Sequence, residues 1–488
     1  MEDKTNNYLN EYQIRIKKAE EFKKKGFEVW NNSIKQSHKI NEIKKINNSE
    51  FEKIYSICGR IISKREHGQS IFFTIKDDSG IIQCYLKNNE EKIEIFENFK
   101  NFFDFGDYIY VEGSLFLTKT NELTIRTNNI IMLSKCLHQI PDFHTGLNDI
   151  ETKYRKRYLD MLVYDETKEK FIKRSKIIQF IREFLNLNNF LEVETPMLHP
   201  IPGGATAKPF ITKHNALDTN FYLRIAPELY LKRLVVGGLE KVYEINRNFR
   251  NEGLSIRHNP EFTMLEFYMA NENYEYAMDF VENLIRNILI KLNNSLNIKY
   301  QKNDIDFSKP FLRLNVKECL IKFSNFNENE LNEKNINETC KKHNINFENN
   351  SYYKKLFLLF EEFSEKKIIE PVFLIDFPIE ISPLAKCDSK NKNIASRFEL
   401  FICGMEISNG FNELNDPFDQ SERFKDQVKE KEKGDEEAMH YDSDYINALE
   451  YGLPPCAGVG IGIDRLVMII TNSKSIKDVI LFPSMKKI

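Results

Sequence analysis

Apolar and polar residues alternate in five short runs between residues 54 and 127, as expected for β-strands that bury one face. Asp77-Asp78-Ser79-Gly80 separates the second run from the third and is a strong hairpin signal. Apolar residues spaced three and four apart predict helices over 4–26 and 168–187. The five strand-like runs are 54–62, 70–76, 81–86, 108–117 and 122–127. The pattern therefore predicts a helix, a group of short strands and then a second helix.

Five short strands within about 75 residues are typical of an OB-fold barrel, which binds single-stranded nucleic acid on one strand face. Phe72 and Gln83 lie on neighbouring predicted strands, where one can stack on a base while the other bonds its edge. Arg60 lies close enough in the pattern to contact a phosphate or a base. Because Phe73 faces the opposite side from Phe72, the alternative is that Phe72 is the core residue.

A charged hairpin is predicted over residues 242–268, where two alternating runs flank a polar loop marked by Gly253 and Pro260. Arginine offers a planar fork to phosphate or carboxylate oxygens, and an aromatic ring offers a face to a base. The polar and aromatic residues of this loop include Arg250, Glu252, Arg257, His258, Asn259 and Phe262. An ordinary charged surface hairpin is the alternative, but this concentration favours a site for an anionic, aromatic ligand.

Two carboxylates, Glu399 and Glu406, form the next candidate site. If residues 398–407 are one strand bent at Gly404, both acids can converge near Arg250. Paired carboxylates beside a triphosphate suit Mg²⁺, which prefers hard oxygen ligands, whereas a pair of strand-surface acids is the alternative. The residues that alternate onto one face just afterwards are Asn409, Phe411 and Glu413.

Glycine-rich turns mark two further places where backbone can approach a ligand closely. In 458–465 the glycines allow packing beneath a nucleotide, Asp464 is predicted to cap the next helix, and Arg465 points toward an anion. Gly204 lies in a second turn. Glu228 stands at a helix start, either as an acid matched to the helix dipole or as a receptor for an ammonium group. The phosphate-binding pattern Gly-x-x-x-x-Gly-Lys is absent, which excludes the commonest other ATP-binding fold.

Length, composition and charge further limit the number of domains and the class of protein. A length of 488 residues predicts two or three domains, because single cores stop growing near ~250 to 300 residues. No apolar run approaches roughly 18 residues, so no membrane association is expected. The net charge of −3 means that any nucleic-acid site is a local patch. Eight cysteines without Cys-x-x-Cys favour free thiols, and the N-terminus lacks a secretory signal, so a cytoplasmic location is expected.

Three segments together resemble the class II aminoacyl-tRNA synthetases. Phe-Arg-x-Glu, a loop and Arg-His-x-Pro-Glu-Phe, from Phe249 to Phe262, resemble motif 2 of that family. The helix, strand and proline of 168–196 resemble motif 1, and 458–465 resembles motif 3. This order behind an OB-fold matches subclass b, whose members attach Asp, Asn or Lys. From about Ile57 to Pro483, strings such as Ala-Pro-Glu-Leu-Tyr-Leu-Lys-Arg are similar to lysyl-tRNA synthetases of bacterial type.

The resemblance implies roles for individual residues. It implies that Arg250 and Arg465 are catalytic and that Glu399 and Glu406 bind Mg²⁺. Lysine-binding positions would be Gly204, Glu228, Arg250, Tyr268, Asn409, Phe411 and Glu413. ATP-binding positions would be Arg250, Glu252, His258, Asn259, Phe262 and Arg465. Anticodon-binding positions on the OB-fold would be Arg60, Phe72 and Gln83. The acids Glu228 and Glu413 suit a substrate with two ammonium groups.

The expected fold is α+β, with an N-terminal OB-fold β-barrel followed by a class II catalytic domain, an antiparallel sheet flanked by helices. The expected segments are a helical extension over 1–50, the anticodon-binding barrel over 51–140, a linker over 141–167 and the catalytic domain over 168–488. A helical insertion is expected at about 312–365.

The implied activity is ligation of L-lysine to tRNA(Lys) through lysyl-adenylate, with ATP as co-substrate and Mg²⁺ as cofactor. The motif 1 resemblance implies a homodimer. Two alternatives stay open. One is an OB-fold nucleic-acid protein with a degenerate catalytic body, against which the intact Arg250, Glu399, Glu406 and Arg465 argue. The other is a ligase that attaches lysine to a protein, whose known relatives lack the anticodon domain.

Overall fold

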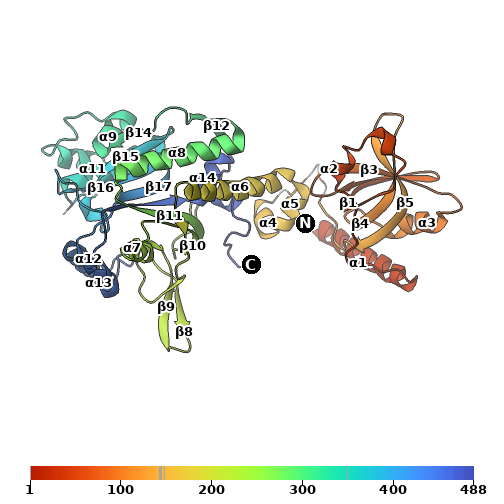
Figure 1. The fold of residues 1–488 in the computed structure, drawn as a ribbon, viewed down its shortest axis with the longest axis horizontal. Helices are drawn as coiled ribbons and strands as arrows, with labels where there is room; N and C mark the ends of the chain where they lie inside the picture. Colours follow the sequence, from red (N-terminus) through yellow and green to blue (C-terminus); the bar gives the residue numbers. More distant parts are fainter. Residues whose placement is uncertain (1, 142–145, 148, 349, 488) are drawn as a thin grey trace. The chain divides into compact units, whose positions relative to one another are not determined.

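The computed structural model describes residues 2–141, 146–147, 149–348 and 350–487. Contacts within the chain divide it into two compact units, Met1–Asn148 and Asp149–Ile488 (Figure 1). No helix in the described part of the chain is long and apolar enough to span a membrane.

The first unit is built on a closed five-stranded barrel in the order β1-β2-β3-β5-β4, which confirms the predicted barrel. Its strands are β1 (Tyr55–His67), β2 (Ser70–Lys76), β3 (Ile81–Lys87), β4 (Tyr108–Leu117) and β5 (Leu123–Ser134). β1 extends beyond the predicted end because it pairs with β2 as far as His67 opposite Ser70. β5 extends because it pairs with β4 as far as Ser134 opposite Tyr108.

Helices pack against the barrel and complete its core. They are α1 (Glu2–Lys24), α2 (Ile40–Ile43) and α3 (Ile93–Phe102), with a 3-10 turn η1 (Asn48–Glu50). The sequence patterns did not predict α3. It buries Phe96, Phe99 and Phe102, and the rings of Phe99 and Phe73 lie 4.5 Å apart. Burial of these aromatic rings is the main stabilising contribution of α3 to the barrel.

The second unit contains an eight-stranded sheet in the order β14-β15-β16-β17-β18-β11-β10-β6 (Figure 1). Only the outermost pairs, β14 with β15 and β10 with β6, are parallel. The strands are β6 (Leu191–Glu192), β10 (Lys241–Phe249), β11 (Glu261–Ala270), β14 (Leu312–Asn315), β15 (Val372–Pro378), β16 (Ile394–Ile402), β17 (Met405–Asn412) and β18 (Cys456–Gly462). A largely antiparallel sheet flanked by helices agrees with the expected α+β fold.

Helices α6 (Asp165–Leu187) and α8 (Tyr274–Asn293) pack against each other, and α8 also packs against β16, β17 and β18. Their apolar faces join the sheet in one core that includes Ile181, Phe267 and Ile285. The opposite face of the central strands remains available for a site. The other helices of this unit are α4 (Ile150–Arg155), α5 (Arg157–Val163), α7 (Glu228–Val236), α12 (Pro417–Glu432), α13 (Ser443–Glu450) and α14 (Ile463–Ile470).

Between β14 and β15 the chain forms three helices with a core of their own. They are α9 (Val316–Ser324), α10 (Ile336–Lys342) and α11 (Tyr352–Phe363). Leu320, Leu359 and Phe360 pack there against Leu374 of β15. The remaining strands are β7 (Leu198–His199), β8 (Ile211–His214), β9 (Thr219–Leu223), β12 (Asn297–Tyr300) and β13 (Asn303–Asp306). The remaining 3-10 turns are η2 (Glu365–Lys367), η3 (Ile379–Ile381) and η4 (Ile476–Asp478).

Two sequence interpretations were wrong in detail. Residues 398–407 are not one bent strand, because Cys403 and Gly404 take positive φ values of 50° and 63° and reverse the chain between β16 and β17. Two consecutive left-handed residues make a tight hairpin turn. The strand expected between the helix of 168–187 and the proline at 196 shortens to Leu191–Glu192, since β10 pairs with it only through Val242 and Tyr243.

Candidate active site

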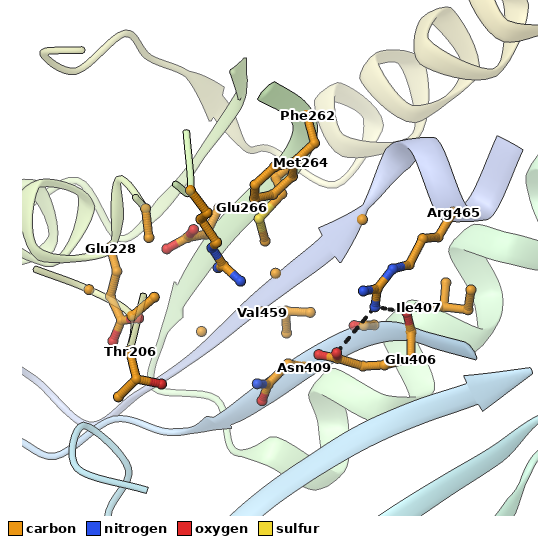
Figure 2. A pocket seen from close by; sticks show the side chains of 18 of the residues that line it. Thr206, Glu228, Phe262, Met264, Glu266, Glu406, Ile407, Asn409, Val459 and Arg465 are labelled. Atoms are coloured by element: carbon orange, nitrogen blue, oxygen red, sulfur yellow. Dashed lines mark hydrogen bonds and ion pairs between the residues drawn. The ribbon is translucent and has the colours of Figure 1, made fainter. Parts of the chain in front are cut away.

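A cavity of about 280 Å³ opens on the central strands of the second unit (Figure 2). Its walls come from the β10–β11 hairpin, β17, β18, the first turns of α7 and α14, and the loops around residues 204 and 383. The candidate residues that line it are Gly204, Glu228, Arg250, Glu252, His258, Asn259, Phe262, Tyr268, Glu406, Asn409, Phe411, Glu413 and Arg465. Segments far apart in the sequence therefore converge on one cavity.

Glu399 does not line the cavity but lies next to it. On the neighbouring strand, it pairs in register with Asn409. Figure 2 shows that Glu228 and Thr206 lie at one end of the cavity, while Arg465 and Glu406 lie at the other. The cavity thus has an acidic end and an end with arginine, which the following contacts define.

The β10–β11 hairpin positions Arg250. Phe249 pairs with Glu261, and the backbone N–H of Arg250 donates to the Pro260 carbonyl at 2.9 Å, which holds the first loop residue in place. The guanidinium lies 5.2 Å from the ring of Phe262. Its Nε is buried and has no hydrogen-bond partner among the described residues. Burial lowers the pKa of Arg250, against the opposing effect of Glu252 and Glu406. A half-buried cation with a buried, unused donor suits an anionic ligand.

Three buried carboxylates, Glu228, Glu266 and Glu413, define the acidic end, with exposed fractions of 7%, 4% and 1%. The Tyr268 hydroxyl donates to Glu266 Oε1 at 2.7 Å. Lys232, one turn along α7, donates to Glu228 Oε1 at 2.5 Å and forms an ion pair with Glu413. Burial raises the pKa of Glu266 to about 8, and Glu228 adds to that rise. Burial also raises the pKa of Glu228 and of Glu413, while Lys232 opposes it.

Glycines make room at this end. A Cβ at Gly458 would lie 2.0 Å from Glu413 Oε1 and 2.4 Å from a ring carbon of Tyr268, so no other residue fits without displacing both. Gly204 has φ of +86°, and a Cβ there would lie 3.0 Å from the Cβ of Glu228. The side chains of Glu413 and Glu228 therefore have room only because positions 458 and 204 are glycines.

Each candidate metal-binding acid is paired with an arginine. Arg397 donates to Glu399 Oε1 at 2.6 Å, and Arg465 donates to Glu406 Oε2 at 3.2 Å. Burial raises the pKa of Glu399 to about 8, with a further contribution from the nearby charge of Glu406. Within the described ranges, no group of three or more His, Cys, Asp or Glu side chains could hold a metal ion. Glu399 on β16 and Glu406 on β17 are thus two carboxylates on neighbouring strands, each held by an arginine.

His258 and Asn259 are fixed by local hydrogen bonds. His258 Nε2 lies 2.9 Å from the Arg465 guanidinium, and burial followed by the charge of Arg465 lowers the His258 pKa. Asn259 Nδ2 donates to the Glu261 carbonyl at 2.5 Å, and its Oδ1 accepts from the Ser484 N–H at 3.3 Å. His258 is thus uncharged near neutral pH, and Asn259 connects the loop to the C-terminal segment.

The prediction that Asp464 caps α14 was wrong. Gly462 occupies the cap position, and Asp464 accepts a hydrogen bond from the Thr263 N–H at 2.7 Å. Arg174 of α6 forms an ion pair with it at 2.6 Å. Asp464 is only 2% exposed and connects α14 to β11 and to α6. This network fixes the position from which Arg465 reaches the cavity.

Arg60, Phe72 and Gln83 lie in the first unit. Phe73 is buried in the barrel core and Phe72 is half-buried on the opposite face, where its ring lies 4.8 Å from that of Tyr85. Gln83 Nε2 donates to Thr124 Oγ1 at 2.9 Å. Arg60 donates to the Gly106 carbonyl at 2.6 Å. The barrel therefore has aromatic, amide and guanidinium groups on its strands.

Three further residues, which the sequence patterns did not predict, have a place in these sites. Glu266 lines the cavity and stands two residues before Tyr268 on β11, a spacing that puts both on one face of a strand. Lys232 is four residues after Glu228, a spacing that puts both on one face of a helix. Tyr85 lies opposite Phe72 in the barrel, which alternation along β3 could have indicated.

Comparison with known proteins places the chain in a family. The profile described as tRNA synthetases class II (D, K and N) matches residues 149–486, and the profile described as OB-fold nucleic acid binding domain matches residues 55–133. The chain therefore belongs to the class II tRNA synthetases, of the group that handles D, K and N.

Individual relatives have one name in common, lysine–tRNA ligase. The protein of that name from Neisseria meningitidis serogroup A is 52% identical over 433 residues, which are 88% of this chain and 86% of the relative. The one from Nitrosomonas europaea is 52% identical over 434 residues, with the same coverage. The one from Legionella pneumophila strain Lens is 50% identical over 489 residues, 98% of this chain and 97% of the relative.

Proposed function

We propose that this chain joins lysine to tRNA(Lys) in two steps. ATP first activates lysine to lysyl-adenylate with release of pyrophosphate, and the lysyl group then passes to the 3′-terminal ribose of the tRNA. One observation carries the choice of amino acid, namely the three buried carboxylates Glu228, Glu266 and Glu413 at one end of the cavity. An aspartate or asparagine side chain would need a cationic or amide-reading group there. The name of the relatives supports the same substrate.

The two ammonium groups of lysine would bind at this acidic end. Glu228 and the backbone at Gly204 would receive the α-amino group, and Glu413 with Tyr268 would hold the side-chain ammonium. Glu266 lies within the same set through its hydrogen bond from Tyr268. The lysine carboxylate would bind Arg250 and Asn409, while Phe411 would contact the substrate from the pocket wall. Buried ion pairs of this kind discriminate strongly, because a substrate without the charge leaves the carboxylate unpaired.

ATP would bind at the arginine end. Phe262 would stack on adenine, and Glu252 would accept from the adenine amino group. Arg250 would bind the α-phosphate, which its unpartnered buried Nε supports. His258 and Arg465 would lie toward the γ-phosphate, where their present contact at 2.9 Å keeps them together. Asn259 would support the loop that carries them.

Activation forms a bond between a lysine carboxylate oxygen and the α-phosphorus, and breaks the bond from that phosphorus to the leaving pyrophosphate. The carboxylate is already ionised near pH 7, so no general base is needed. Rate comes from in-line alignment and from neutralising charge as it develops, which Arg250 and Arg465 would do. In the second step the ribose hydroxyl oxygen attacks the lysyl carbonyl carbon, the bond from that carbon to the AMP oxygen breaks, AMP leaves with the bonding electrons, and the hydroxyl proton is released.

Glu399 and Glu406 fit Mg²⁺. They supply hard oxygen donors, and Mg²⁺ typically takes only one or two carboxylates while it shares the rest of its shell with waters and phosphate oxygens. When bound, the ion would neutralise charge on the pyrophosphate. Arg397 donates to Glu399 and orients it, whereas the ion pair of Glu406 with Arg465 would open when ATP and Mg²⁺ bind.

The barrel would bind the anticodon. Phe72 would stack on a base, Gln83 would bond a base edge, and Arg60 would contact a phosphate or base. The ring of Tyr85 beside Phe72 extends the stacking surface. A cytoplasmic location belongs to this proposal, since tRNA is charged where translation takes place.

We also infer a homodimer through the motif 1 region. Apolar side chains are exposed along it, and they include Ile172 at 53%, Leu187 at 78%, Leu191 at 51% and Leu198 at 43%. A row of exposed apolar residues over one helix and the segment after it indicates a surface for a protein partner. The two-fold pairing of class II synthetases uses the same segment.

Amino-acid-dependent exchange of pyrophosphate into ATP tests the function. Lysine should support exchange far better than any other amino acid in a panel, and the full reaction should charge tRNA(Lys). Exchange without tRNA charging would leave activation correct but the acceptor wrong, as for a ligase that modifies a protein. Tight RNA binding without any exchange would instead identify a nucleic-acid binding protein.

A further inference from the structure

Lys232 lies behind the acidic end of the cavity without lining it. It is fully buried, and its Nζ donates to Glu228 Oε1 at 2.5 Å and forms an ion pair with Glu413 Oε2. Phe411 and Tyr445 place their ring centroids 5.5 and 6.0 Å from the same nitrogen. One ammonium of the chain therefore connects the two carboxylates proposed to bind the two ammonium groups of the substrate.

Charged and titratable groups face Lys232 from five elements. They are Glu228 on α7, Glu413 after β17, Glu266 on β11, Tyr445 on α13 and Cys456 on β18, and Tyr268 of β11 joins this set through its hydrogen bond to Glu266. Arg397 of β16 acts on the same set through Glu228. Burial by itself lowers the Lys232 pKa, but Glu228 and Glu413 outweigh it and hold the pKa well above its usual value. Lys232 is therefore charged at neutral pH.

The charges can be counted. With lysine bound and the Glu266 carboxyl ionised, three carboxylates and one ammonium give the acidic end a net charge of −2, whereas in the free cavity the raised pKa of Glu266, about 8, leaves this carboxyl largely protonated at neutral pH. The α-ammonium and side-chain ammonium of lysine bring +2. Without Lys232, the three acids would exceed the charge of the substrate by one. An uncompensated buried carboxylate takes up a proton instead of staying ionised.

We propose that Lys232 is a positioning and specificity-determining residue, which orients Glu228 and Glu413 and sets the charge of the cavity to match a substrate with two ammonium groups. This inference rests on the proposed lysine substrate. Its consequence concerns selectivity as well as affinity. Without Lys232, Glu413 or Glu228 is protonated for part of the time. A protonated carboxyl group binds a substrate hydroxyl group nearly as well as it binds a substrate ammonium group. The cavity should then discriminate less between lysine and 6-hydroxynorleucine, the analogue with a hydroxyl in place of the side-chain ammonium.

The test compares Lys232→Met with the wild type in pyrophosphate exchange. KM for lysine should rise roughly 30-fold or more, as for removal of one member of a buried charge pair, while KM for ATP should change by less than about threefold. The preference for lysine over 6-hydroxynorleucine should fall about tenfold. Lys232→Arg keeps the charge and should recover much of that preference. Arg233→Gln, which removes a cation from the next position of α7 paired with Asp442, should keep the wild-type preference.

A pH series provides a readout that a purely structural role would not move. In Lys232→Met the lysine kcat/KM should rise more steeply between pH 6.5 and 9 than in the wild type, because the acids must first lose a proton. Lys232→Gln, which keeps a hydrogen-bond donor for Glu228, serves if the Met variant does not fold. Parallel rises in both KM values, or an unchanged preference and pH profile, would overturn the inference. A wild type that does not activate lysine would instead overturn the proposed function.

Discussion

Arg465 Nη1 lies 3.2 Å from Glu406 Oε2 and 2.8 Å from the Glu406 carbonyl oxygen. Arg465 belongs to α14 and Glu406 to β17, so the pair joins two elements at the arginine end of the cavity. In the proposed function the arginine binds the γ-phosphate and the carboxylate binds Mg²⁺. The phosphate and the metal ion would have to bind together to separate this ion pair. Binding of only one of them would leave the charge of the other side chain without a partner. ATP and Mg²⁺ are therefore expected to bind with positive coupling.

Arg465→Ala should raise the KM for ATP and slow pyrophosphate exchange. A charge-assisted contact contributes about 1.5 to 3 kcal/mol, which corresponds to roughly 10- to 150-fold in kcat/KM for ATP. The KM for lysine should change much less. Arg313→Ala, which removes an arginine paired with Asp279 on the surface of the same unit, is the matched control. A folded Arg465→Ala protein with wild-type ATP kinetics would remove Arg465 from the site.

Phe72→Ala should weaken tRNA charging and leave lysine activation untouched. Stacking is worth roughly 1 to 3 kcal/mol per base, so the KM for tRNA should rise about 5- to 150-fold. Ile93→Ala, at an exposed apolar position on α3 of the same unit, provides the control. If pyrophosphate exchange falls as far as charging does, Phe72 acts through folding of the chain and does not contact the anticodon.

The KM for lysine should fall as the pH rises from 6 to 8 and level off above that. Burial, followed by the charge of Glu228, raises the Glu266 pKa to about 8, so this carboxyl is largely protonated at pH 6. A bound ammonium favours the ionised form, so lysine binding releases a proton and strengthens with pH up to about 8. Glu266→Gln should flatten the profile. A KM for lysine that does not depend on pH in the wild type would exclude this coupling.

Sedimentation should show a species of about 115 kDa, twice the chain mass of 57.7 kDa. Leu187→Glu places a charge on an apolar side chain that is 78% exposed and should shift the equilibrium toward the single chain. Phe418→Glu, at an 80% exposed position on α12, is the matched control and should remain dimeric. A wild type that sediments only near 58 kDa at micromolar concentration would contradict the dimer.

Sequence patterns predicted the strands and turns whose formation depends on residues close together in the sequence. The barrel strands and the β10–β11 hairpin follow from alternation and turn residues, and motif spacing brought Arg250, Glu413 and Arg465 toward one cavity. The turn between β16 and β17 escaped prediction because Cys403 is a rare residue for positive φ. Without that turn the two acids could not be placed on neighbouring strands.

The sequence patterns could not predict which partner a side chain takes from a distant part of the sequence. Asp464 could cap its own helix on local grounds, yet the N–H of Thr263 and the side chain of Arg174 take it instead. Lys232 follows Glu228 at the usual spacing of a surface ion pair on a helix. Only the packing of α7 against β11 and α13 shows that this pair is buried. Contacts between residues distant in sequence determine whether such an ion pair is buried, and burial changes the energetic contribution of the pair.

Glu413→Gln should reduce lysine kcat/KM roughly 30-fold to several thousand-fold. The variant keeps the size of the side chain but removes the counter-charge for the substrate ammonium, and truncating one side of a buried charge pair typically costs about 2 to 5 kcal/mol. Glu413 is 1% exposed, and its Oε1 has no hydrogen-bond partner among the described residues, which leaves that oxygen for a ligand. Pyrophosphate exchange at saturating ATP measures the effect.

The KM for ATP should change far less in Glu413→Gln, because the acidic end lies across the cavity from Arg465 and Glu406 (Figure 2). Glu450→Gln, at an exposed position of α13, controls for the loss of a carboxylate alone. Wild-type exchange in Glu413→Gln would remove this residue from lysine recognition. A wild type that activates aspartate or asparagine better than lysine would overturn the substrate and leave the family assignment intact, since the family includes enzymes for all three amino acids.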